Sequence, residues 1–402
     1  MKYQNIIDNM TLKEKAAFLS GKSEWQTRDF PRLDIPAIFC SDGPNGVRKQ
    51  AGAGDHLGIN PAVPATCFPT AAAMANSWDE ELEQRVGVAL GEESMEEDVN
   101  VLLGPGLNIK RNPLCGRNFE YFSEDPYLSG KMAAAFIRGV QSTGAAACAK
   151  HFAVNSQELR RMAMNAVVDE RTLREIYLTG FEIAIKEGGA KTVMSSYNEV
   201  NGVYANENEH LLKDILRDEW GFEDSVITYW GASNDHSLGV KNGSTLEMPT
   251  PGLDAARELL ASVESGKISE KDIDERVDEL LDLVLTTTEN AKHYKKVADK
   301  KALHEEHHKL ARLACENSAV LLKNEDGILP VGAKVQAAII GDFAFDPRYQ
   351  GAGSSMVNST KVDSIKDMLE TSGISVTGIV RGYQRDGKED EAMKKEAVDL
   401  AR

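Results

Sequence analysis

A buried strand that ends in a turn is predicted by the stretch Asp224-Ser225-Val226-Ile227-Thr228-Tyr229-Trp230-Gly231-Ala232. Its centre, Val226–Thr228, is apolar and β-branched, with polar residues before it and Gly231 after it. A short run of this kind is typical of a strand inside a parallel sheet. In a parallel α/β barrel the carboxyl ends of the strands carry the chemistry. We therefore expect Tyr229 and Trp230 on the rim of a pocket.

Short apolar runs like this one alternate along the chain with longer helical patterns such as Trp78–Glu97 and Arg171–Lys186. The apolar runs are Ile38–Cys40, Ala71–Met74, Val99–Leu103, Ala146–Ala149, Thr192–Ser195 and Val226–Thr228. Roughly six or seven strand–helix units within about 250 residues predict an α/β protein whose parallel sheet closes into a TIM-type (β/α)8 barrel. A doubly wound sheet is the alternative, but no glycine-rich dinucleotide turn follows the first strand.

The chain has 402 residues, which is enough for a barrel and a smaller second domain. Residues 1–285 are predicted to form the barrel domain. Residues 286–309 are charged and poor in apolar side chains, so we assign them to an interdomain linker. Residues 310–402 begin a second domain, with a strand at Val335–Ile340 and a loop at Gln350–Ser355. A fragment of this size does not enclose a core, so we expect this domain to be incomplete.

Composition and charge exclude several classes of partner. The formal net charge of −17 argues against nucleic acid and anionic membrane surfaces. Met1–Asn5 lead into a helix without an apolar signal region, and the five cysteines are scattered, which together indicate a cytoplasmic protein with reduced thiols. No metal or other cofactor is expected, because cysteines and histidines lack metal-ligand spacing. His304, His307 and His308 lie on a charged helix, where we expect them to be solvated.

Two segments resemble a known family. Val-Ile-Thr-x-Trp-Gly-Ala at residues 226–232 and Leu-Glu-Met-Pro at residues 246–249 are similar to the nucleophile segment of the family 3 glycoside hydrolases, the β-glucosidase family. In that family x is the aspartate that attacks the anomeric carbon, whereas this chain has Tyr229. The resemblance implies a retaining glycosidase with a β-glucoside, glucose or a short β-gluco-oligosaccharide in the barrel pocket. It also implies that residues 310–402 begin an α/β sandwich domain, which the C-terminal remainder of the protein or a second chain completes; a homo-oligomer is a further option.

Two motifs that follow predicted strands carry charged side chains suited to sugar hydroxyls. Ser41–Arg48 contains Asp42, which by resemblance accepts hydrogen bonds from the sugar; an aspartate in an ordinary Gly-Pro turn is the alternative. Gly116–Pro126 is the most specific match, and there Arg117 resembles the family's sugar-binding arginine. A buried Arg117–Glu120 ion pair that shapes the loop is the alternative, and the two roles are compatible.

Lys150-His151-Phe152 follows an apolar strand and precedes Asn155–Glu158, as in the β-glucosidase branch of the family, where the lysine and histidine bind substrate. The N-acetylglucosaminidase branch continues instead with Pro-Gly-His, whose histidine supplies the acid/base group and is absent here. Adjacent strand residues point to opposite faces, so Lys150 and His151 reach one sugar only from an irregular backbone.

Two aromatic residues complete the predicted substrate site. Tyr197, in the segment Ser195–Asn198 at the end of a strand, corresponds to a tyrosine that hydrogen-bonds the family's nucleophile and packs against the sugar. Trp230 matches the family's platform tryptophan, whose flat apolar face suits the C–H surface of a pyranose. A tryptophan of the core is the alternative for Trp230.

The sequence does not supply both of the carboxyl groups that retaining hydrolysis requires, which lie about 5–5.5 Å apart. Tyr229 takes the nucleophile position, and a phenol, with an ordinary pKa of about 10, is a weak nucleophile at neutral pH. The family's acid/base glutamate lies in a Glu-x-Glu-Gly-x-Asp-Arg-like stretch, which does not occur before Arg402. Asp235 and Glu247 follow the strand too late to replace a group at its tip. We therefore expect this chain to be inactive.

Three hypotheses explain Tyr229. A laboratory or natural loss of the nucleophile in an otherwise intact family member ranks first. A non-catalytic homologue that binds or senses a sugar ranks second. A working tyrosine nucleophile, as in some sialidases, ranks third. Sialidase substrates carry a carboxylate beside the anomeric centre, whereas the binding residues here suit a neutral glucoside.

Overall fold

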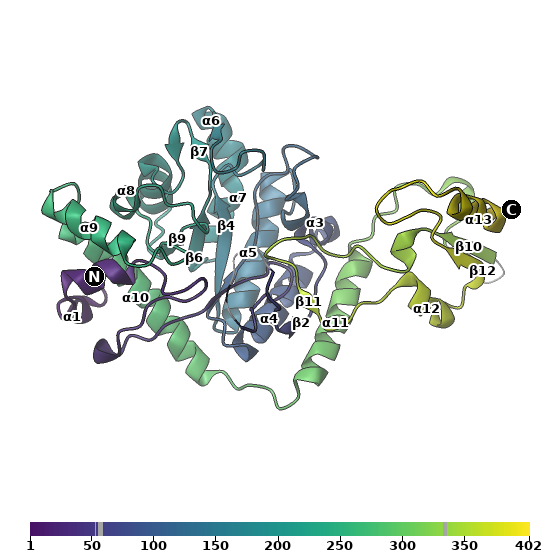
Figure 1. Ribbon diagram of the computed structural model, residues 1–402, viewed down its shortest axis with the longest axis horizontal. Coiled ribbons are helices and arrows are strands. Elements are labelled where there is room, and N and C mark those ends of the chain that lie inside the picture. Colours follow the sequence, from purple (N-terminus) through teal and green to yellow (C-terminus); the bar gives the residue numbers. More distant parts are fainter. Residues whose placement is uncertain (53, 55–58, 333–335) are drawn as a thin grey trace.

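The computed structural model describes residues 1–52, 54, 59–332 and 336–402, which form two domains (Figure 1). The larger domain lies on the left of the figure with the N-terminus, and the smaller one on the right with the C-terminus. Helix α11 (Lys300–Asn317) lies between them. No helix in these residues combines the length and apolar composition that a membrane span requires.

The larger domain is built on five parallel strands in the order β1-β3-β4-β6-β9. They are β1 (Cys40–Asp42), β3 (Val101–Leu103), β4 (Ala146–Phe152), β6 (Thr192–Ser195) and β9 (Ser225–Ile227). Every residue in them is buried. Successive side chains of a strand point to opposite faces, so Leu102 joins one apolar cluster while Val101 and Leu103 join another. Burial on both faces explains why these strands appear in the sequence as continuous apolar runs.

Single β-bridges close this sheet into a ring. Residues 246–247 pair in parallel with Ile227 of β9 on one side and with Ser20 on the other. Gln26 then pairs with Phe39, directly before β1, in antiparallel orientation. The predicted α/β class and barrel architecture are confirmed. The segments that close the ring were not predicted, because they are short and contain no apolar run.

Most helices of the larger domain pack outside the ring. They are α1 (Gln4–Ile7), α2 (Leu12–Phe18), α4 (Glu80–Glu96), α5 (Pro126–Ser142), α6 (Glu170–Thr172), α7 (Thr179–Lys186), the π-helical segments η4 (Leu173–Leu178) and η5 (His210–Glu219), α8 (His236–Asn242), α9 (Asp254–Glu264) and α10 (Glu270–His293). Asp79 and Asp125 start α4 and α5 by accepting hydrogen bonds from backbone N–H groups. Gly139 lets these two helices pack closely, since a Cβ there would lie 2.3 Å from the carbonyl oxygen of Gln84.

One predicted strand is wrong. Ala71–Met74 forms the helix α3, followed by the 3-10 turn η2 (Ala75–Ser77). Alanine has the highest helix propensity of all residues, and this run contains no β-branched side chain. Apolar character alone therefore gave a strand where the local preference of the residues gives a helix.

The smaller domain contains a parallel pair of strands, β10 (Gln336–Ile340) and β12 (Ser375–Val380), with the helices α12 (Ile365–Ser372) and α13 (Glu391–Ala401). Val335, where we predicted the first of these strands to begin, lies outside the described residues. A segment of this domain returns to the barrel, where β11 (Asn358–Ser359) pairs with β2 (Pro64–Ala65). The domain division at 285 and 309 stays a prediction; α10 runs through this region to His293.

Helix α11 packs against α4 through histidine–carboxylate pairs. His307 Nδ1 lies 2.7 Å from Glu93 Oε1, and its Nε2 lies 3.0 Å from Glu92 Oε2. His304 and His308 beside it are half-buried. The prediction that these histidines are solvated is wrong, most clearly for His307, which is 6% exposed. Its partners lie more than two hundred positions away in the sequence, so the sequence of the charged helix did not indicate that His307 would be buried and paired.

The His307 pairs make a pH-dependent contribution to stability. Burial by itself would lower the pKa of His307, but hydrogen bonds to Glu92 and Glu93 outweigh it and raise the pKa to about 9. A histidine whose pKa is raised in the folded state makes its full contribution to the stability of the fold at pH values below its ordinary pKa of about 6.5. This contribution is lost as the pH rises through about 9.

We expect His307→Gln to lower the free energy of unfolding by about 3 kcal/mol at pH 6 and by much less at pH 10. Denaturant titrations followed by circular dichroism at both pH values measure this difference. His293→Gln is the control, because His293 pairs with Glu289 on the exposed surface. A loss at pH 10 as large as that at pH 6 would contradict the prediction.

Candidate active site

Six of the seven predicted site residues line one cavity of about 270 Å³ at the carboxyl end of the sheet. Asp42 is the last residue of β1, and Lys150 belongs to β4. Tyr197 and Tyr229 each stand two residues beyond a strand, β6 and β9 respectively. The lining residues from the predicted set are Asp42, Arg117, Lys150, Tyr197, Tyr229 and Trp230. The seventh, His151, stacks against Tyr229.

Asp42 and Lys150 form a buried ion pair, with 2.8 Å between Oδ1 and Nζ. Asp42 also accepts hydrogen bonds from the backbone N–H of Gly43, at 2.9 Å, and from Ser354 Oγ of the smaller domain, at 2.6 Å. Burial by itself would raise the pKa of Asp42, but Lys150 and these hydrogen bonds hold it below its ordinary value. Burial would likewise lower the pKa of Lys150, and Asp42 raises it instead. Both groups are therefore charged at neutral pH.

The predicted irregular backbone is present at the end of β4. The pairing of β4 with β6 shifts register between Lys150 and Phe152, and the Lys150–His151 peptide bond is cis. The side chain of Asn108 satisfies both backbone polar groups of His151, accepting from its N–H and donating to its carbonyl oxygen, each at 2.8 Å. Lys150 lines the cavity, whereas His151 is fully buried and contacts the lining residue Tyr229.

Arg117 is held by several partners at once. It forms an ion pair with Glu120, so the predicted loop-shaping pair exists beside the cavity. Its Nη2 lies 3.1 Å from His151 Nε2. A guanidinium only donates, so we assign the proton of the neutral imidazole to Nδ1, which lies 3.4 Å from the hydroxyl oxygen of Tyr121. Burial first, and the charges of Arg117 and Lys150 second, hold the pKa of His151 well below its ordinary value.

Tyr229 is fixed within a stack of planar groups. The centre of its ring lies 4.5 Å from that of His151, with 22° between the planes, and 3.7 Å from that of Tyr197, with 32° between the planes. The guanidinium of Arg117 lies 5.4 Å from the centre of the same ring. An aromatic ring therefore occupies the strand tip at which the resemblance places a carboxylate.

Trp230 lines the cavity together with Trp25, which sequence reasoning missed. The two ring centres lie 5.0 Å apart. Trp230 Nε1 donates to the carbonyl oxygen of Glu24 at 2.8 Å, and Trp25 Nε1 donates to Gln50 at 2.7 Å. Both polar edges are thus satisfied inside the protein, which leaves apolar ring surface for the cavity. Trp25 lies in a segment without strand or helix, so no pattern in the sequence marks it.

The polar lining residues outside the predicted set include Glu158, Arg161 and Ser354. Arg161 Nη1 lies 3.0 Å from Glu158 Oε2, and its guanidinium lies 4.8 Å from the centre of the Tyr197 ring. Glu158 closes the segment that follows Lys150-His151-Phe152, so its position beside a known motif was the available signal. Ser354 lies in the glycine-rich loop of the smaller domain, about three hundred positions from Asp42, and only the fold brings it here.

The two carboxylates nearest to Tyr229 in the following sequence have structural partners. Asp235 caps α8 and pairs with Lys267 at 2.7 Å. Glu247 pairs with His236 at 2.9 Å. Neither lines the cavity in the described part of the chain.

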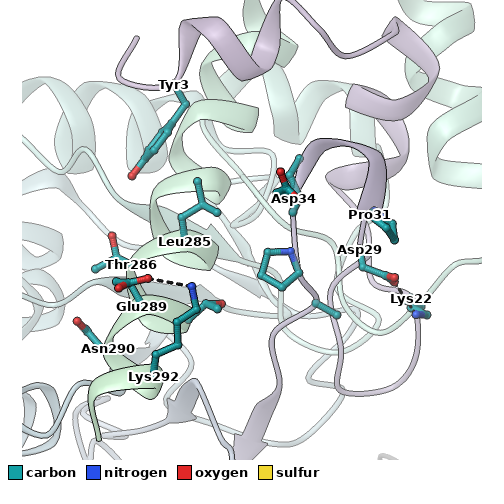
Figure 2. A pocket seen from close by; sticks show the side chains of 14 residues that line it. Tyr3, Lys22, Asp29, Pro31, Asp34, Leu285, Thr286, Glu289, Asn290 and Lys292 are labelled. Atoms are coloured by element: carbon teal, nitrogen blue, oxygen red, sulfur yellow. Dashed lines mark hydrogen bonds and ion pairs between the residues drawn. The ribbon is translucent and has the colours of Figure 1, made fainter.

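A larger groove of about 910 Å³ lies elsewhere, between residues 29–37 and the C-terminal part of α10 (Figure 2). Asp34 and its neighbours precede β1, so this groove lies toward the amino end of that strand. Its lining, within the described residues, includes none of the predicted site residues. Size alone therefore does not identify the functional site here.

Comparison with known proteins gives the family. A model described as "Glycosyl hydrolase family 3 N terminal domain" matches residues 19–283. The chain belongs to glycosyl hydrolase family 3. It is 48% identical to thermostable beta-glucosidase B of Acetivibrio thermocellus over 392 aligned residues. The alignment covers 96% of this chain and 51% of that protein. The chain is 41% identical over 409 residues to an exo-alpha-(1->6)-L-arabinopyranosidase of Bifidobacterium longum, covering 98% and 53%.

Solved structures of family 3 members have the same fold. A beta-glucosidase of Bifidobacterium adolescentis gives a TM-score of 0.90 at 41% identity, covering 98% of this chain and 56% of the other. Beta-glucosidase 3B of Thermotoga neapolitana in complex with glucose gives 0.87 at 37% identity, covering 100% and 56%. The chain spans about half the length of the curated relatives it matches.

The Asp42–Lys150 pair generates a stability prediction. Lys150→Met leaves an ionised Asp42 without its main partner, and breaking a buried pair on one side typically costs about 3–5 kcal/mol. We expect this loss in the free energy of unfolding, and we expect Asp42→Asn in the same chain to restore most of it. Equilibrium unfolding of the wild type, both single variants and the double variant measures the coupling.

Lys22→Met provides the matched control for this cycle, since Lys22 forms a largely exposed pair with Asp29. Its loss is expected to be at most about 1 kcal/mol. If the effects of Lys150→Met and Asp42→Asn simply add, the pair is not what stabilises the mouth of the barrel.

Proposed function

We propose that the cavity binds the pyranose ring of a β-glucoside and that this chain, as it stands, does not hydrolyse it. The observation that carries the proposal is the set of residues around one cavity: hydroxyl-binding side chains are present, and Tyr229 stands at the tip of β9. Family membership and the glucose-bound relative support a sugar ligand.

The charges around the cavity suit a neutral sugar. Each cation has its own carboxylate partner: Lys150 pairs with Asp42, Arg117 with Glu120, and Arg161 with Glu158. Such pairs offer donors and acceptors side by side without a net charge, which is what a polyhydroxylated ring requires. The apolar face of Trp230 supplies the surface for the C–H side of the ring.

The proposed inactivity rests first on Tyr229. Retaining hydrolysis needs a carboxylate that attacks the anomeric carbon and a second carboxyl group that protonates the leaving oxygen. A tyrosine serves as nucleophile where a neighbouring base activates it. In the described part of the chain no carboxylate hydrogen-bonds to the Tyr229 hydroxyl, and the ring is packed between His151 and Tyr197. The 402 residues also lack the acid/base motif that the resemblance implies.

A non-catalytic sugar-binding or sensing homologue is the second candidate. The stacked Tyr229 favours it, because a side chain fixed by two aromatic neighbours is built into the site. In either case the remainder of a longer protein or a second chain would complete the smaller domain. The two candidates differ in the effect expected from Tyr229→Asp, which restores hydrolysis only in a family member that has lost its nucleophile.

Calorimetry tests the binding half of the proposal. We expect weak binding of glucose or L-arabinopyranose by the wild type, and at least tenfold weaker binding by Asp42→Ala. A hydrogen bond to a charged group is worth about 1.5–3 kcal/mol, which sets this magnitude. Asp254→Ala, at an exposed ion pair with Arg257, is the control. Equal heats from the wild type and Asp42→Ala would remove the sugar-binding proposal.

Activity tests the catalytic half in a two-by-two comparison. Tyr or Asp at position 229 is combined with either the 402-residue chain or a chimera that adds the C-terminal half of the Acetivibrio relative. Each form is assayed with an ordinary aryl glucoside and with a dinitrophenyl glucoside, whose good leaving group needs little acid assistance.

We expect Tyr229→Asp in the short chain to stay near background on the ordinary glucoside, because nucleophile and acid act in one sequence of steps. The same substitution in the chimera is expected to restore retaining hydrolysis, as a lost nucleophile in an otherwise intact site predicts. An inactive Tyr229→Asp chimera that still binds glucose would favour the non-catalytic homologue. Strong activity from the short Tyr229 form would overturn the proposal.

A further inference from the structure

Arg117 and Glu158 face each other in the cavity across a gap that no direct hydrogen bond fills. Arg117 Nη1 lies 3.8 Å from Glu158 Oε1, which is beyond hydrogen-bond distance. Both atoms are buried, and neither has a hydrogen-bond partner among the residues that the structure describes. Both side chains line the cavity.

The remaining polar atoms of the two side chains are already engaged. Glu158 Oε2 accepts from Arg161 Nη1 at 3.0 Å. On Arg117, Nε pairs with Glu120 and Nη2 lies 3.1 Å from His151 Nε2. Each side chain is therefore held in place by other partners, while one donor and one acceptor are left facing each other. A buried polar atom without a partner costs about 1–3 kcal/mol, and more for a charged group.

The two atoms without a partner, Arg117 Nη1 and Glu158 Oε1, determine which kind of ligand group can pair with both. A guanidinium N–H only donates and a carboxylate oxygen only accepts, so a ligand group that pairs with both has to accept on one side and donate on the other. A hydroxyl does both, and two atoms 3.8 Å apart are close enough for one oxygen, lying to the side of the line between them, to be about 2.8–3.0 Å from each. An anion would be repelled by Glu158, and a cation by Arg117.

We propose that one hydroxyl of the pyranose occupies this gap, accepting from Arg117 Nη1 and donating to Glu158 Oε1. Glu158 is thereby a ligand-binding residue, in addition to holding Arg161. This inference rests on the proposed sugar-binding function and adds a specific contact to it. The contact ties recognition of one hydroxyl to the segment that follows β4.

The test is calorimetry with glucose and with its 2-, 3-, 4- and 6-deoxy derivatives, on the wild type and on Glu158→Gln. In this variant the amide oxygen faces the donor Arg161, so the amide N–H₂ faces the gap and does not accept the ligand proton. We expect at least tenfold weaker glucose binding by Glu158→Gln. For one deoxy sugar, the one without the bridging hydroxyl, both proteins should bind equally.

Two further variants separate this contact from a structural effect. Arg161→Gln breaks the same ion pair but leaves Oε1 of Glu158 in the cavity, so it should weaken all five sugars to a similar degree. Glu175→Gln removes an exposed pair with Arg171 of nearly the same length, 3.1 Å, and should change nothing. Thermal unfolding of each variant reports whether it folds.

The outcomes distinguish this inference from the proposed function. Unchanged glucose binding by Glu158→Gln, or equally weaker binding of all five sugars, overturns the hydroxyl contact while sugar binding stands. If the wild type binds none of the sugars, the proposed function fails and the contact fails with it. A loss of affinity that disappears for a single deoxy sugar supports the contact and names the hydroxyl.

Discussion

The buried ion pair between Asp42 and Lys150 holds the mouth of the barrel together. It joins the ends of β1 and β4, which are not neighbours, since β3 lies between them. A pair of charges away from water is tolerated only where further hydrogen bonds satisfy the remaining lone pairs and protons. The Asp42 carboxylate meets this condition with Gly43 of the adjoining turn and Ser354 of the smaller domain. One carboxylate thus fixes two strands, a turn and the approach of a second domain.

The cavity that results belongs to both domains. Residues 352–355 of the smaller domain line it beside the strand ends of the larger one. Contacts outside the cavity lining also join the parts of the chain: β11 of the smaller domain pairs with β2, and His307 of α11 pairs with Glu92 and Glu93 of α4.

Binding and bond cleavage make separate demands on this site. Binding needs donors and acceptors held in fixed positions, which the three ion pairs around the cavity provide. Retaining cleavage needs a carboxylate as nucleophile. At the end of β9, where the resemblance places that group, the chain has an aromatic ring stacked against His151 and Tyr197. The residue at the end of β9 can change while these three ion pairs stay in place, because they lie on β1, β4 and the segments around residues 117–120 and 158–161.

The sequence by itself determined the α/β barrel, the five strands of its sheet and six residues that line one cavity, because these depend on short apolar runs and on local motifs. It also places a tyrosine at residue 229. Only the tertiary structure decided what depends on distant partners: the burial of His307, the ring closure at Ser20 and Gln26, and the places of Trp25 and Ser354 in the cavity. The one wrong strand, Ala71–Met74, is a helix, because the helix propensity of its alanines outweighs the apolar pattern from which we predicted a strand. A contact between residues hundreds of positions apart leaves no periodicity in either segment, so folding alone brings its members together.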